Sequence, residues 1–173
     1  MEFEEYVVAR GQALMRLAYV MTGDQHAAED LTQAALLDAL RHWRRVSRAA
    51  HPDAYVRRVM VNRYLATRRS KASTELVLED VEPLSHGFAA DPAVGVADRD
   101  EVRRALAALA PRARTVLVLR YYADLDDAAI ADSMGLASGT VRATASRALA
   151  LLRASLSSPR SNPRSSPRLT KDT

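Results

Sequence analysis

The stretch 124–156 constrains the fold of this chain most, because it predicts two helices around a tight turn. Asp126 and Asp127 are acids of the kind that stabilise the start of a short helix. Gly135 follows where a helix ends in the left-handed conformation, and Ser138 can cap a second, longer helix. Two helices joined by a three- to four-residue turn with glycine predict a helix-turn-helix.

The second helix of this stretch separates into two faces at about 100° per residue. The face expected to pack inward carries Val141, Ala145, Ala148, Leu149 and Leu152. The outer face carries Arg142, Ala143, Ser146, Arg147, Ala150 and Arg153. Small residues separate the arginines and no acid interrupts them, so this face can approach a phosphate backbone. The alternative is a solvated amphipathic helix, but the short helix and the glycine turn before it favour DNA binding.

Composition places the chain among cytoplasmic helical proteins of one or two small domains. It has 173 residues, 48% of them hydrophobic, and no cysteine, which excludes disulfides and thiolate metal sites. The N-terminus is acidic and lacks the features of a signal peptide, and no apolar run is long enough to span a bilayer. The four histidines show no metal-ligand spacing, and no nucleophile has His or Asp partners. We therefore expect no enzyme activity, no cofactor and no metal.

The net charge of +4 conceals a partition along the chain. Residues 1–71 carry a net charge of +4 and residues 72–100 a net charge of −6. Residues 101–156 and 157–173 each carry a net charge of +3. Two basic blocks around an acidic connector indicate two modules that face nucleic acid.

Residues 3–21 and 25–46 are predicted to form the first two helices, with a break at 22–24. In the second helix, the expected core stripe is Leu31, Ala35, Leu36, Ala39, Leu40 and Trp43. Another stripe aligns Asp30, Gln33, Leu37, Arg41 and Arg44 at helical spacing. A leucine within a charged stripe indicates a protein-contact surface, although single exposed leucines are also common.

Residues 53–69 are predicted to form a basic helix after a loop at 46–53. Val56, Val59, Met60 and Leu65 are expected to face inward, and Arg57, Arg58, Arg63, Arg68 and Arg69 to surround them, with Tyr55, Asn62 and Tyr64 between. Arginines interleaved with aromatic rings suit a single-stranded or opened nucleic acid. The alternative is a solvated basic helix whose tyrosines belong to the core.

The rest of the chain predicts a linker, two further helices and a tail. Residues 71–99 contain Pro and Gly and show no hydrophobic periodicity, so we expect a flexible acidic linker. Its r.m.s. end-to-end distance should be about 30 Å. Residues 100–109 and 111–122 are expected to be helical, with Pro111 in the first turn of the second. The Ser/Pro/Arg-rich tail 157–173 is expected to be disordered. The fold class is thus all-α, with two small helical domains, 1–70 and 100–156.

The sequence resembles the extracytoplasmic-function (ECF) sigma factors of the sigma-70 family that contain only regions 2 and 4. AEDLTQAALLDALRHW resembles region 2.1–2.2, PDAYVRRVMVNRYLATRR resembles region 2.3–2.4, and LAPRARTVLVLRYYADLDDAAIADSMGLASGTVRATASRALALLR resembles region 4.1–4.2. Both modules occur in the family's order with a linker of suitable length. Some positions differ from the family pattern, including Ala129, Ala137, Ala143 and Thr144. Because of Ala143 and Thr144, the second helix of the turn motif has fewer side-chain groups that can form hydrogen bonds with base edges.

The resemblance implies a sigma factor that binds core RNA polymerase and directs promoter recognition and transcription initiation. The implied partners are core polymerase, through its β′ clamp helices and β flap, promoter DNA and an anti-sigma factor. Polymerase contact is expected through Asp30, Gln33, Leu37, Arg41 and Arg44. Contact with the −10 element is expected through Tyr55, Arg57, Arg58, Asn62 and Arg63, with a pocket for a flipped base near the loop 46–53. Contact with the −35 element is expected through Thr140, Arg142, Ala143, Ser146 and Arg147.

Two other functions are compatible with the residues alone. A stand-alone helix-turn-helix regulator would bind duplex DNA tightly without polymerase, usually as a dimer. A helical module that binds only a protein partner would show no salt-dependent DNA binding.

Overall fold

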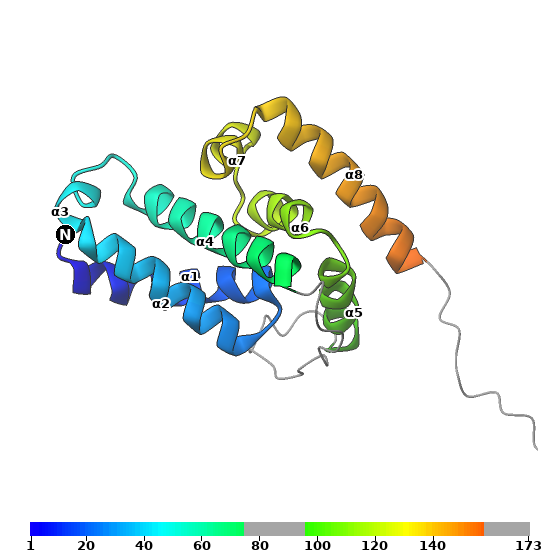
Figure 1. The fold of residues 1–173 in the computed structure, drawn as a ribbon, viewed down its shortest axis with the longest axis horizontal. Helices are drawn as coiled ribbons and strands as arrows, with labels where there is room; N and C mark the ends of the chain where they lie inside the picture. The colour runs from blue at the N-terminus through cyan, green and yellow to red at the C-terminus, as the bar shows by residue number, and fades with distance from the viewer. Residues whose placement is uncertain (75–95, 158–173) are drawn as a thin grey trace, which may run out of the picture.

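The computed structural model describes residues 1–74 and 96–157, and side chains within 1–70 and 101–157. Every regular element of these residues is helical, as the sequence predicts (Figure 1). No helix in the described part of the chain is long and apolar enough to cross a membrane. The predicted tail after Ser157 and most of the predicted linker lie outside the described residues.

The N-terminal module packs three long helices against one another, with one short helix at the end of the bundle (Figure 1). These are α1 (Phe3–Thr22), α2 (Gln25–Arg41), α3 (Trp43–Val46) and α4 (Pro52–Thr74). Gly23 ends α1 in the left-handed conformation, with φ +76°, and the side chain of Asp24 then accepts a hydrogen bond from the Ala27 amide at 2.7 Å to cap α2. Trp43 closes the end of this bundle, where its ring lies 5.0 Å from the Tyr6 ring between centroids.

The second predicted helix is interrupted, and one core assignment within it is wrong. The helix α2 ends at Arg41, and His42 adopts a non-helical conformation before α3 begins at Trp43. Leu40 lies within α2, about 100° around the helix from the buried Ala39, and is therefore beyond the edge of the buried face. Trp43 is 9% exposed, whereas Leu40 is 47% exposed and belongs to the surface rather than to the core.

The C-terminal module contains the helix-turn-helix. It consists of α5 (Val96–Ala107), α6 (Pro111–Leu117), the π-helical turn η1 (Val118–Tyr122), α7 (Asp127–Met134) and α8 (Ser138–Ser157). Both helices beside the predicted linker extend into it, α4 to Thr74 and α5 from Val96. Pro111 occupies the first turn of α6, as predicted.

The two modules pack against each other, with α7 lying on α4 and η1 beside α1 (Figure 1). A buried arginine of α6 joins them. Arg114 is 6% exposed and donates from Nη1 to the carbonyl of Met21 at the end of α1 (3.2 Å). Its Nη2 donates to the carbonyl of Ala107 within its own module at 2.5 Å. Burial lowers the pKa of this guanidinium. Backbone carbonyl oxygens accept the hydrogen bonds from its two Nη atoms.

Candidate functional site

The charged stripe predicted on α2 lies on the surface of the N-terminal module. Asp30, Gln33 and Arg41 are exposed on α2, and Arg44 is exposed on α3. Leu37 is 55% exposed within this stripe. The helices therefore bring all five predicted polymerase-contact residues to accessible positions.

A second leucine on the same helix was assigned to the core from the sequence. Leu40 follows Leu37 by three residues, so the two side chains are neighbours on α2. An exposed leucine pair flanked by Gln33 and Arg41 combines an apolar centre with a polar rim, which is the anatomy of a protein-binding surface. The signal that could have found Leu40 is its position about 100° around α2 from Ala39.

The residues predicted to contact the −10 strand point in different directions from α4. Arg58 and Asn62 are exposed one turn apart and face the C-terminal module. Arg57 faces α1. Tyr55 is partly buried and packs against the core, and Tyr64, at 3% exposed, belongs to the core. Of the two tyrosines between the arginines, Tyr64 is therefore explained by packing.

Arg63 faces α2 and forms a two-point ion pair there. Its Nε donates to Asp38 Oδ2 at 2.7 Å, and its Nη2 lies 2.6 Å from the same oxygen. Asp38 Oδ1 also accepts from Arg41 Nη1 at 3.1 Å. The hydrogen bond from Arg63 lowers the pKa of Asp38 and raises the pKa of Arg63. Asp38 thus joins a predicted polymerase contact to a predicted −10 contact, a role that helical spacing alone did not indicate.

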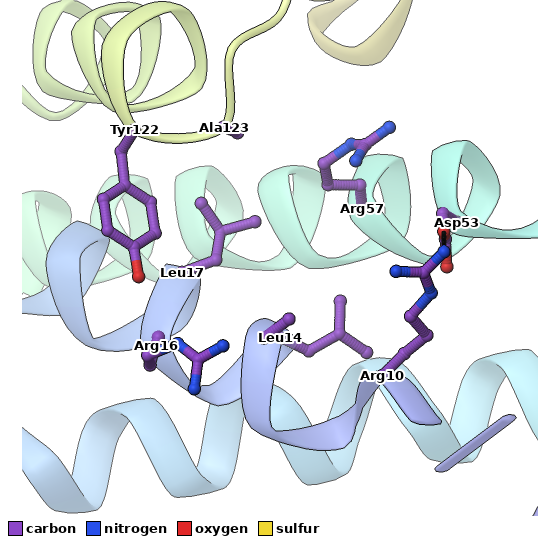
Figure 2. A pocket seen from close by; sticks show the side chains of 9 residues that line it. Arg10, Leu14, Arg16, Leu17, Asp53, Arg57, Tyr122 and Ala123 are labelled. Carbon is purple, nitrogen blue, oxygen red and sulfur yellow. Dashed lines mark ion pairs between the residues drawn. The ribbon is translucent and has the colours of Figure 1, made fainter. Parts of the chain in front are cut away.

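A basic cleft opens beside the start of α4, at the end of the loop 46–53 (Figure 2). Its volume is about 270 Å³, and its charged lining is Arg10, Arg16, Asp53 and Arg57. Arg10 Nη2 lies 3.1 Å from Asp53 Oδ2, which leaves an excess of positive charge. Figure 2 shows Tyr122 of η1 reaching toward α1 to form one wall of the cleft.

The helix-turn-helix has the caps expected at both ends of α7. Asp126 accepts a hydrogen bond from the Ala129 amide at 2.7 Å, and Gly135 has φ +63°. The start of α8 differs from the prediction. Because the Ala137 carbonyl accepts the first helical hydrogen bonds, from the amides of Thr140 and Val141, Ser138 is the first residue of α8 and not its cap.

The outer face of α8 is accessible, as its pattern predicts. Thr140, Arg142, Ala143, Ser146 and Arg147 are all exposed, whereas Val141, Ala145 and Ala148 are buried. Asp127 of α7 lies close to this face and pairs with Arg120, while Arg142 Nε stands 3.4 Å from its other oxygen. Arg142 is 71% exposed and keeps most of its guanidinium surface open to a ligand.

Nothing in the described residues gathers three or more metal-binding side chains. The predicted contact residues other than Arg44 lie on three helices: those on α2 and α8 are exposed, whereas α7 packs on α4. Such surfaces bind macromolecules by shape and charge.

Comparison with known proteins matches both modules separately. The family described as Sigma-70 region 2 matches residues 7–74, and the family described as Sigma-70, region 4 matches residues 99–152. The RNA polymerase sigma-E factor of Streptomyces avermitilis is 37% identical over 158 residues, which cover 91% of this chain and 87% of that protein. The ECF RNA polymerase sigma factor SigL of Mycobacterium tuberculosis is 32% identical over 145 residues, which cover 83% of this chain and 82% of SigL.

A solved structure shares the arrangement of helices. It is the sigma factor RpoE in complex with the anti-sigma factor NepR from Bartonella quintana, with a TM-score of 0.75 at 21% sequence identity. The alignment covers 91% of this chain and 98% of that chain. At this identity the likeness supports the fold.

Proposed function

The chain belongs to the extracytoplasmic-function RNA polymerase sigma factors of the sigma-70 family, which direct transcription initiation, and we propose that its three surfaces divide that work. The surface on α2 binds core polymerase, the basic start of α4 engages the opened −10 strand, and the outer face of α8 anchors the −35 duplex. The protein acts in the cytoplasm, where polymerase is found.

The observation that carries the polymerase surface is the exposed leucine pair on α2. Leu37 and Leu40 expose about half of their area beside Asp30, Gln33 and Arg41. Apolar side chains that stay in water on a folded helix gain free energy when a partner covers them. We place the β′ clamp helices on this surface, with Asp30 and Arg41 setting their orientation.

The −10 strand is assigned to the basic cleft and the adjoining face of α4. Arg10 and Arg57 supply positive charge for phosphates, and the cleft lies beside the loop 46–53, where we expect a flipped base to bind. Flipping a base costs a few kcal/mol, which contacts in such a cleft must offset. Arg58 and Asn62 extend the surface along α4, and Arg63 adds positive charge while Asp38 holds it in place.

The −35 duplex is assigned to α8. Arg142 and Arg147 contact phosphates, and Thr140 and Ser146 offer hydroxyl groups between them. The side chain of Ala143 cannot form a hydrogen bond with a base. This helix therefore contacts the DNA backbone more than it recognises base edges. The C-terminal module is also assigned to the β flap of polymerase, and an anti-sigma factor is a further partner, as NepR is for the Bartonella protein.

A titration of core polymerase tests the surface on α2. Asp30→Arg and Leu37→Glu should each weaken the affinity of the fluorescently labelled protein for core enzyme about tenfold or more, as central interface positions do. The matched control is Glu4→Arg, the same charge reversal at an exposed acid of α1 outside the stripe. Equal affinity for all four proteins would contradict the assignment.

A further inference from the structure

An aspartate of α7 lies against the outer face of α8. Asp127 is the first residue of α7, directly after the capping residue Asp126, and α8 packs on α7 (Figure 1). Asp127 Oδ2 lies 3.4 Å from Arg142 Nε, and its Oδ1 pairs with Nη2 of Arg120 from η1. The helix α8 itself contains no acidic residue, so α7 supplies the carboxylate that Arg142 contacts.

The chain between η1 and α7 holds this carboxylate in place. The amide of Leu125 donates to the carbonyl of Leu119 at 3.0 Å, and Asp124 just before Leu125 has φ +50°. This turn brings Arg120 beside Asp127, where their side chains are 25% and 27% exposed. Water and salt screen such a partly buried pair less than a fully exposed one. The carboxylate is therefore anchored on η1 before it contacts α8.

The contact leaves most of the Arg142 guanidinium available to a ligand. It is made at Nε, whereas four of the five N–H donors of a guanidinium are on its Nη atoms, and the side chain is 71% exposed. Those donors can form two parallel hydrogen bonds with a phosphate. An arginine that a neighbour already restricts loses less rotamer freedom when a phosphate fixes it. Two arginines and one aspartate also leave this group with a net charge of +1, which still attracts DNA.

We propose that Asp127 is a positioning residue for the −35 contact: it orients Arg142 toward the DNA backbone, and Arg120 holds Asp127 in turn. The role of Arg142 at the −35 duplex rests on the proposed function, whereas the ion-pair group rests on the contacts themselves. Positioning and simple charge repulsion predict opposite effects when the carboxylate is removed. A carboxylate that only repels phosphates would weaken DNA binding, so its loss would strengthen binding.

Holoenzyme formed with the full chain tests the proposal on a promoter obtained by run-off transcription. The measured quantity is the ratio of affinities for the intact promoter and for the same promoter truncated downstream of the −35 element. Arg142→Ala should lower this ratio about tenfold, as loss of a charged hydrogen bond does. Asp127→Asn should lower it about two- to fivefold, the range expected for one ion pair.

The double variant Asp127→Asn/Arg142→Ala separates positioning from a role in fold stability. If Asp127 acts through Arg142, its loss should have no further effect once residue 142 is alanine. A purely structural aspartate would lower the ratio by the same factor in both backgrounds. That result would overturn the proposal, as would a ratio that rises with Asp127→Asn alone.

Asp124→Asn is the matched control. It removes the same charge three residues earlier, at an exposed position whose positive φ asparagine also tolerates, and it should leave the ratio unchanged. A loss equal to that of Asp127→Asn would overturn the proposal. An unchanged ratio for Arg142→Ala would refute the −35 assignment of α8 and the proposal with it. A lowered ratio for Arg142→Ala with an unchanged ratio for Asp127→Asn would refute the positioning role alone.

Discussion

At the scale of single residues, Asp38 accepts hydrogen bonds from Arg41 of α2 and Arg63 of α4. It thereby links the candidate surface on α2 to the one on α4. Its pKa lies below the ordinary value because Arg63 donates a hydrogen bond to the charged carboxylate. A carboxyl group with a lowered folded-state pKa stabilises the protein fully above its unfolded pKa of about 4. That stabilisation is lost as the pH falls through the lower folded value.

Asp38→Asn should therefore lower the free energy of unfolding at pH 7 by about 0.5–1 kcal/mol, since the pair is partly exposed. The difference from the parent protein should shrink as the pH falls through the lowered folded-state pKa of Asp38, where the parent carboxyl is also protonated. Urea unfolding at pH 7, 5 and about 3 measures this. Glu4→Gln, at an exposed acid of α1, serves as the control, and a difference that stays constant into acid would refute the role of the ion pair.

At the scale of elements, the turn of the helix-turn-helix depends on one glycine conformation. Gly135 has φ +63°, a region that side-chain-bearing residues seldom adopt, and a Cβ there would meet no atom within 4 Å. Backbone strain, and not a steric clash, is thus the cost of any substitution. Gly139 lies in the first turn of α8, has no such φ and also has open space around its Cα.

Gly135→Ala should destabilise the protein by about 1 kcal/mol. Gly139→Ala should leave the stability unchanged or raise it by up to about 1 kcal/mol, because alanine is the better helix former. Thermal and urea unfolding of the two variants makes a matched comparison. A loss of stability at Gly139 equal to that at Gly135 would show that the left-handed turn is not what Gly135 supplies.

Elements with local signals were predictable from the sequence, and elements set by tertiary packing were not. The caps at Asp126 and Gly135, Pro111 in the first turn of α6 and the two faces of α8 follow from neighbouring residues. The break at His42 carries no Gly or Pro, so the sequence does not mark it. Leu40 is predicted to be in the core but is exposed, because the apolar stripe on α2 is wider than the face that the other helices cover. The predicted start of α8, near Gly139, is one residue late because serine suits both a cap and a first helical turn.

At the scale of the whole molecule, packing between the modules decides which residues of α4 are accessible. Tyr64 had two interpretations in the sequence, and its burial among other helices selects the core. Arg114 and Met21 are separated by 93 positions in the chain, and no local pattern relates them. The candidate surfaces on α2 and α8 could be located from helical periodicity. The packing of α7 on α4 could not, because it joins segments far apart in the sequence.

The proposed function places three binding surfaces on one chain. α2 carries an exposed leucine pair, the start of α4 lines a basic cleft, and α8 carries exposed arginines. Each surface is weak alone, and the chain joins them covalently, so that binding of one raises the effective concentration of the next. Loss of the α2 surface should therefore abolish promoter-specific activity even when both DNA surfaces remain intact.

Run-off transcription with purified bacterial core polymerase on a genomic promoter library tests this account most directly. The protein should produce discrete start sites that core enzyme alone does not produce. Asp30→Arg should abolish them and Glu4→Arg should retain them. Transcripts that persist with Asp30→Arg would contradict the α2 assignment, and a parent protein that produces no transcript but shifts duplex DNA by itself in a salt-dependent manner would contradict the account as a whole.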